Sequence, residues 1–393
     1  MRRIFALPLA AALFFSLLAF PAAAVGTESS SQGSPNSPDP EGTVTWENLD
    51  SRIRSGSLAF QALLENISSV EAIDYDQMMD NLRTQINQIA NAQWYTALSG
   101  GDSGSLDQTY ASLRETFEDI KDGELQADNA DVVWQLKDAS NQVVAAGQKL
   151  YITLVGLEQS VQDLERQIAA LDRQLTDARL REQLGRASAQ TVSSLEQSRA
   201  QLVSQKESLN TTITKYKSQL QSLIGETPTG ELTLGPLPTE ADTDWTQPDY
   251  EADLASAKAA SWTIRDAEAT LADAKETWKD ARLDYTGSKQ KYLLEMAEHT
   301  WNSAQLTYQS TIQDFECSFQ TLYQSLFDYE QVLETKKSAL SYQETQLAVT
   351  QKKYELGLAS YYDVLTAQDN VSAAQSGVDS AWRDLFTARN DYA

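Results

Sequence analysis

The chain has 393 residues, of which 22% are charged, and a formal net charge of −25. Such a negative chain is a poor ligand for nucleic acid and for anionic lipid headgroups. The single cysteine, Cys317, excludes an intrachain disulfide. Its place between Phe315 and Phe319 predicts a small, buried apolar side chain. High charge with little Gly or Pro favours an all-α rod.

The N-terminus has the pattern of a secretory signal peptide. Met1-Arg2-Arg3 is basic, residues 4–20 are apolar, and a small-residue cleavage site ends at Ala24. Residues 1–24 are therefore predicted to be a signal peptide, with an uncleaved membrane anchor as the alternative. Residues 25–43, rich in Ser, Gly, Pro and Glu, are predicted to form a disordered linker.

Proline divides the rest of the chain into two halves. The 9 prolines fall in the signal segment, the first linker and residues 228–248. Because proline breaks helices, its absence elsewhere permits long ones. We expect a first helical repeat over 44–224, a Pro/Gly linker over 225–249 and a second repeat over 250–393. Whether the second linker wraps the molecule or hangs free is left open.

Heptads predict a helical hairpin in each half. A 4-3 spacing of apolar residues runs from Leu150 to Ala178, and leucines and a tyrosine recur every seven residues after it. The second half repeats this design, with alanine at every second seam position of its last arm. Each arm is expected to span about 40 residues, or about 60 Å of helix. The sequence thus predicts two long antiparallel coiled-coil hairpins.

The front of each half is also predicted to be helical, over 46–97 and 250–323. Between 98 and 132 the first half carries Gly100, Gly101, Gly104 and Gly123. These glycines predict a loop with one short helix.

One motif marks the bend of both hairpins. Leu-Gly-x-Ala-Ser occurs at 184–188 and at 356–360, each followed by a valine at the same offset. Glycine can adopt the left-handed conformation that ends a helix, and serine can cap the next one. Ser360 and Asp363 also have the spacing of a capping box. Capping alone explains these residues about as well as a functional role.

These motifs resemble a known family. Residues 354–368, which read YELGLASYYDVLTAQ, resemble the second-repeat tip of the TolC-like outer membrane efflux family, and QLGRAS at 183–188 resembles the first. The segment VTWENL at 44–49 is similar to the family's opening pattern. The resemblance extends from about Val44 to the end of the chain.

The resemblance implies a homotrimeric α-helical tunnel that meets an adaptor (membrane fusion) protein and an inner-membrane transporter, with no cofactor or metal. It places Tyr354 and Asp363 at the gating mouth of that tunnel. It also implies a set of residues at the adaptor-contacting tips: Leu184, Gly185, Ala187, Ser188, Leu356, Gly357, Ala359 and Ser360. The implied location is the cell envelope, at the outer membrane.

Two departures from the family pattern qualify this picture. Ala359 and Thr366 stand where the family often has a basic and a second acidic residue, so no Arg–Asp latch is implied there. The family's membrane strands would fall at 273–307 and after Trp94 and Tyr95. Neither place alternates apolar with polar residues, so the transmembrane β-barrel is predicted to be absent or vestigial. Without it, the location would be extracytoplasmic.

Two functions are therefore carried forward: an export component, and a non-conducting extracytoplasmic coiled-coil scaffold of the same fold. An enzyme is not expected. His299 is the single histidine, and no metal-ligand cluster, nucleophile elbow or phosphate loop is present in the sequence.

Overall fold

A computed structural model describes residues 40, 42–102, 104–240, 245, 248–285 and 291–392. The predicted signal peptide lies outside these residues, as does most of the predicted linker before residue 44. The helices are α1 Trp46–Gly56, α2 Leu58–Glu71, α3 Tyr75–Leu98, α4 Gly104–Asp122, α5 Glu124–Gln183, α6 Ala189–Leu223, α7 Tyr250–Ala260, α8 Trp262–Asp284, α9 Lys291–Glu355 and α10 Tyr361–Tyr392. The strands are β1 Thr43–Val44 and β2 Thr233–Leu234.

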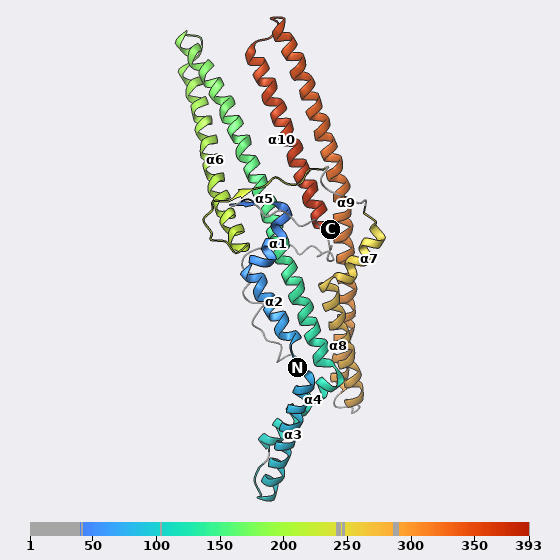
Figure 1. The fold of residues 1–393 in the computed structure, drawn as a ribbon. Coiled ribbons are helices and arrows are strands. Elements are labelled where there is room, and N and C mark those ends of the chain that lie inside the picture. Colours follow the sequence, from blue (N-terminus) through green and yellow to red (C-terminus); the bar gives the residue numbers. More distant parts are fainter. Residues whose placement is uncertain are drawn as a thin grey trace.

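The molecule is an elongated, all-α structure, as the heptads predict (Figure 1). Two hairpins, α5–α6 and α9–α10, point toward the same end. The returning helices α6 and α10 have 35 and 32 residues, close to the expected arm. The outgoing helices are longer than expected, with 60 and 65 residues, or about 90 and 98 Å at 1.5 Å per residue. They continue past the hairpins because no proline interrupts them.

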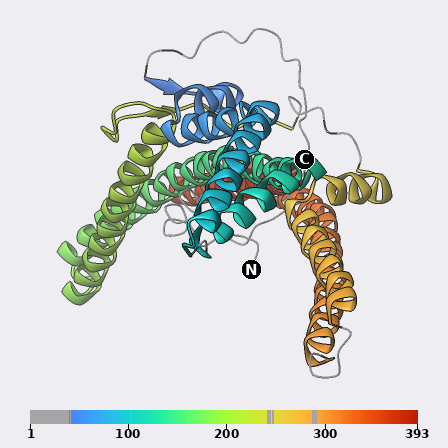
Figure 2. The same cartoon turned by 90° about the horizontal axis from the view of Figure 1, so that it is seen from below.

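Most of the segment from 98 to 132 is helical, and the expectation of a loop with one short helix is wrong. α4 has 19 residues, and α5 begins at Glu124. The glycines lie mainly at the ends of these helices: Gly100 and Gly123 have φ of 72° and 85°, a left-handed conformation that stops a helix. α3 and α4 consequently form a second type of hairpin, which we call the lower hairpin. It projects from the end opposite the α5–α6 bend (Figures 1 and 2).

The main core lies halfway along the rod, around α5. It packs Leu49 and Ile53 of α1, Tyr151 and Leu154 of α5 and Leu220 of α6, all fully buried. Two smaller clusters lie in the hairpins, around Leu175, Ala178 and Val192 and around Leu333, Ala381 and Leu385.

Cys317 is exposed, so the expectation of a buried cysteine is wrong. Phe319 is buried. Residues two apart in an α-helix face opposite sides, so a cysteine two positions from an inward phenylalanine points outward.

The linker between the repeats lies against the body as far as Glu240. β2 pairs in parallel with β1, with Thr43 opposite Thr233 and Val44 opposite Leu234. Farther on, the indole of Trp382 donates to the carbonyl of Pro238 at 2.9 Å, and Lys337 pairs with Glu240 at 2.7 Å. We call β1, β2 and residues 225–240 the belt.

One buried side chain attaches the belt to α5. The Tyr151 hydroxyl donates to the carbonyl of Gly235 at 2.6 Å and lies 3.2 Å from the carbonyl of Val44. The Val44 carbonyl already accepts from the backbone N–H of Gly235 at 2.8 Å. The buried Gly235 carbonyl therefore depends on the tyrosine.

Tyr151→Phe is expected to weaken the belt. The change leaves the Gly235 carbonyl buried without its donor, which costs about 1–3 kcal/mol. Amide hydrogen exchange in α1 and β2 should accelerate accordingly. The control is Tyr342→Phe, because Tyr342 is 60% exposed and should change exchange little. Equal exchange in wild type and Tyr151→Phe would contradict the role given to the hydroxyl.

Candidate functional site

The candidate site consists of the two hairpin bends, which lie at the same end of the molecule (Figure 1). We call residues 184–188 the first corner and residues 356–360 the second corner. Both interrupt the helices where the sequence predicts.

The two corners end their helices in the same way. In the first, the N–H of Gly185 donates to the carbonyl of Glu182 at 2.8 Å, and that of Arg186 to Arg181 at 2.7 Å. In the second, Gly357 and Leu358 donate to Tyr354 and Lys353 at 2.9 and 2.7 Å. This is the Schellman arrangement, and it requires the φ of +71° found at both glycines.

The corners start the next helix differently. Ser188 accepts from the backbone N–H of Thr191 at 3.2 Å. Ser360 accepts from the N–H of Asp363 at 3.2 Å, and the Asp363 carboxylate accepts in return from the N–H and the hydroxyl of Ser360 at 2.7 and 2.8 Å. The predicted capping box is thus present at the second corner.

The capping box lowers the pKa of Asp363. The backbone N–H of Ser360 is the largest cause, and its hydroxyl is the second. Both donors favour the ionised carboxylate. At neutral pH Asp363 is therefore a charged residue that holds the start of α10.

The corners present apolar side chains outward. Leu184, Leu356 and Leu358 are 62%, 74% and 75% exposed. Ala187 and Ala359 are half-buried, and the following valines, Val192 and Val364, are buried. Four uncovered aromatic or leucine side chains flank these positions: Leu180, Tyr354, Tyr361 and Tyr362. Exposed apolar residues grouped at the end of a rod are typical of a contact surface.

Tyr354 and Asp363 interact with different neighbours. The Tyr354 ring packs against Tyr361, with centroids 5.9 Å apart. Asp363 lies at a groove of about 350 Å³ between α9 and α10, lined also by Tyr342, Gln343, Gln346, Thr350, Thr366, Ala367 and Asn370.

A polar ladder between α5 and α10 was not foreseen from the sequence. Its rungs join Gln159 to Arg383, Arg166 to Ser376 and Arg173 to Asp369. On each helix these residues are seven apart, and they run in opposite directions. The seven-residue spacing of these polar residues could have indicated a shared helix face. The sequence contains no signal that α5 lies beside α10. The Arg173–Asp369 pair is an Arg–Asp link, at positions other than those of the family motif.

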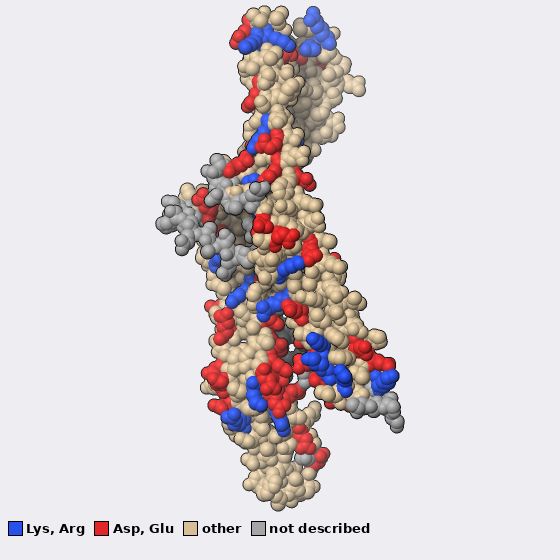
Figure 3. Space-filling view, turned by 90° about the vertical axis from the view of Figure 1, so that its right-hand side faces the viewer, with Lys and Arg blue, Asp and Glu red and all other residues tan. Residues whose placement is uncertain are grey.

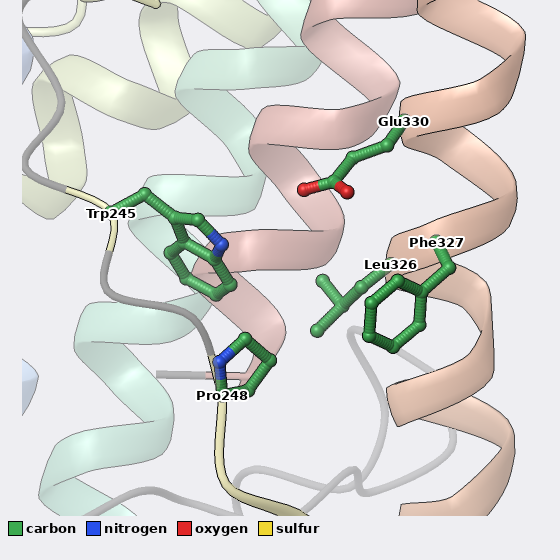
Figure 4. Close-up of a pocket in the computed structure, with 5 residues that line it drawn as sticks. All are labelled: Trp245, Pro248, Leu326, Phe327 and Glu330. Atoms are coloured by element: carbon green, nitrogen blue, oxygen red, sulfur yellow. The ribbon is translucent and has the colours of Figure 1, made fainter.

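A small pocket lies between α9 and two described residues of the linker (Figure 4). Trp245 and Pro248 line one side of the pocket, which has a volume of about 200 Å³. Leu326, Phe327 and Glu330 line the other side. Arg389 spans the same region, paired with Glu330 at 3.0 Å and 4.9 Å from the Trp245 ring. These contacts fasten the end of α10 to α9.

The described part of the chain contains no group of three or more His, Cys, Asp or Glu side chains arranged to hold a metal ion. Its one histidine, His299, is exposed on α9. Among the same residues, no helix is long and apolar enough to span a membrane.

Comparison with solved structures gives the fold. OprN, an outer-membrane channel, is 13% identical, with a TM-score of 0.56 over 95% of this chain and 96% of OprN. The open-state MtrE outer membrane channel of Neisseria gonorrhoeae is 14% identical, with a TM-score of 0.52 over 88% of this chain and 87% of that one. The CmeC outer membrane channel of Campylobacter jejuni is 10% identical, with a TM-score of 0.53 over 72% and 67%.

The chain has a TolC-like fold. The sequence matches no family model and no curated protein. At these identities the likeness concerns the fold alone.

Replacing the corner glycine should strain the second corner. In Gly357→Ala a side chain enters left-handed backbone, which costs about 1–2 kcal/mol. The control is Gly377→Ala within α10, where the added carbon lies 3.7 Å from Lys336 and the change should be neutral or stabilising. Amide exchange at the end of α9 should accelerate in Gly357→Ala and stay unchanged in Gly377→Ala. Equal behaviour of the two variants would show that the corner does not need glycine.

The capping box should persist down to acidic pH. A carboxylate with a lowered folded pKa stabilises the corner above its unfolded pKa and loses this effect as pH falls through the folded one. The corner is therefore expected to stay unchanged from pH 8 to 5 and to fray only below about pH 4. Carboxyl NMR of Asp363 measures its pKa. Ser360→Ala removes the hydroxyl but keeps the backbone donor, so it should raise that pKa only part of the way.

Proposed function

We propose that this protein is a component of a TolC-like export system. It forms, or docks onto, an extracytoplasmic helical conduit and passes cargo without covalent chemistry. The partners we propose are two further copies of the chain, an adaptor protein and an inner-membrane transporter, in the cell envelope. The observation that carries the proposal is the pair of matching corners at one end of a TolC-like fold.

The exposed leucines support a role of the corners in binding the adaptor. Both corners use the same backbone hydrogen bonds to hold their glycine, so each presents its outer leucine on a rigid bend. A rigid apolar anchor loses little entropy when it binds. Gly185, Ala187, Ser188, Gly357, Ala359 and Ser360 would position these anchors rather than supply the contact area.

The gating role of Tyr354 and Asp363 is part of the same proposal. Three subunits would bring three Asp363 carboxylates near one axis, where like charges repel and cations are attracted. The capping box is the competing explanation of Asp363, because its carboxylate already has two donors on Ser360.

The alternative function is a scaffold that keeps the fold without conducting. The half-exposed polar rungs between the repeats are compatible with either function. Oligomeric state separates the two: a closed trimer is expected for a conduit, and a monomer or dimer for a scaffold.

The first measurement is the mass of this protein, without residues 1–24, in solution with and without detergent. A trimer is expected.

The second measurement is the capture of the cognate adaptor by the double variant Leu356→Ser/Leu358→Ser. Capture should fall at least tenfold while helicity stays constant. Leu306→Ser is the matched control, since Leu306 is 67% exposed on α9 far along the chain from the corner. A monomer that captures no adaptor would overturn the conduit.

Channel conductance then tests the proposed gating role of Asp363 at the tunnel mouth. Asp363→Ala should change opening more than Ser360→Ala does. Equal effects would reduce Asp363 to a cap.

A further inference from the structure

The lower hairpin stands apart from the body of the protein. α3 has no buried residue, and Ile120, near the base of the hairpin, is the buried residue of α4. The turn between α3 and α4 lies at the end of the molecule opposite the corners (Figures 1 and 2). A helix pair with so thin a core gains little from its own packing.

The outer part of this hairpin has almost no charge. From Thr84 to Leu113 the charged residues are Asp102 and Asp107, in a chain whose net charge is −25. Asp102 accepts from the backbone N–H of Gly104 at 3.0 Å, and Asp107 accepts from the amide of Gln93 at 2.7 Å. Figure 3 shows the lowest part of the molecule nearly free of acidic and basic side chains, in contrast to the surface above it.

Three apolar side chains are uncovered at the end of α3. Trp94, Tyr95 and Leu98 are 61%, 68% and 67% exposed. The two rings touch edge to face, with centroids 5.2 Å apart. Farther up α3 the exposed positions from 84 to 91 are polar but uncharged: Thr84, Gln85, Asn87, Gln88 and Asn91. Between Thr84 and Leu98, large exposed apolar side chains are thus confined to the end of the helix.

We propose that the end of the lower hairpin rests on a lipid bilayer, with Trp94, Tyr95 and Leu98 in the headgroup region. Tryptophan and tyrosine favour this zone because their rings are apolar and their N–H or O–H groups remain hydrated. The nearly uncharged hairpin lets this end approach a surface that the rest of the chain would avoid. A zwitterionic bilayer fits best, because the total charge disfavours an anionic one.

A second copy of the chain is the less suitable occupant. Lateral packing of helices requires an apolar stripe along their length. Here the exposed face of α3 from Thr84 to Asn91 carries amides and hydroxyls. The geometry therefore suits a shallow contact at the end of the hairpin.

A local probe tests the proposal on the full chain. An environment-sensitive fluorophore is attached at Ala97→Cys in a Cys317→Ser background, and phosphatidylcholine vesicles are added. The emission should shift to shorter wavelength and become protected from aqueous quencher. A probe at Gln309→Cys, exposed on α9, is the control position and should not shift.

Two variants complete the test. Trp94→Ser/Tyr95→Ser/Leu98→Ser should reduce the lipid-dependent shift at residue 97 at least tenfold. Gln85→Ser/Gln88→Ser/Asn91→Ser, in the same hairpin, should leave it unchanged. No shift at residue 97, or a shift that follows protein rather than lipid concentration, would overturn the proposal, the latter in favour of self-association. The assay needs neither adaptor nor transport, so it is independent of the proposed function.

Discussion

The buried hydroxyl of Tyr151 fixes where two segments meet on α5. It holds the start of the first repeat and the linker to the second against the same point of one helix. α5 also packs against α1, α2, α4, α6, α8 and α10. A displacement of the belt along α5 would therefore move both repeats relative to each other. This attachment and the direct contact between α5 and α10 together set the relative position of the two corners.

Two kinds of helix–helix contact are found in the upper half of the molecule. Within each hairpin the arms meet through apolar residues, and the buried clusters around Val192 and Leu385 keep them together. Between the hairpins α5 and α10 meet through charged and amide side chains, many of them half-exposed. Exposed ion pairs contribute only about 0–1 kcal/mol each. Each hairpin is consequently a firm unit, while the contact between hairpins is weak enough to part.

The sequence predicted those features that local chemistry controls. Proline placement and heptads gave the two hairpins, and Gly357, Ser360 and Asp363 gave the second corner with its capping box. Two of its predictions failed on local helix geometry, and a third feature depends on contacts between distant segments. The glycines between 98 and 132 lie mainly at the ends of helices and do not form a long loop. A glycine that ends one helix does not prevent the next helix from starting. Burial of Cys317 was predicted from the apolar residues near it in the sequence. The α-helix places Cys317 on the side opposite the buried Phe319. The partner of Arg173 required knowing which helices lie side by side.

The seven-residue spacing of the rungs bears on how the length of the rod can vary. Removing one heptad from each arm of both hairpins, α5, α6, α9 and α10, would delete a rung and leave the others in register, shortening the reach from belt to corners by about 10 Å. A change that is not a whole number of heptads would rotate the arginines off the shared face. Divergent copies of this architecture are thus constrained to change height in whole-heptad steps, while the belt itself stays the same.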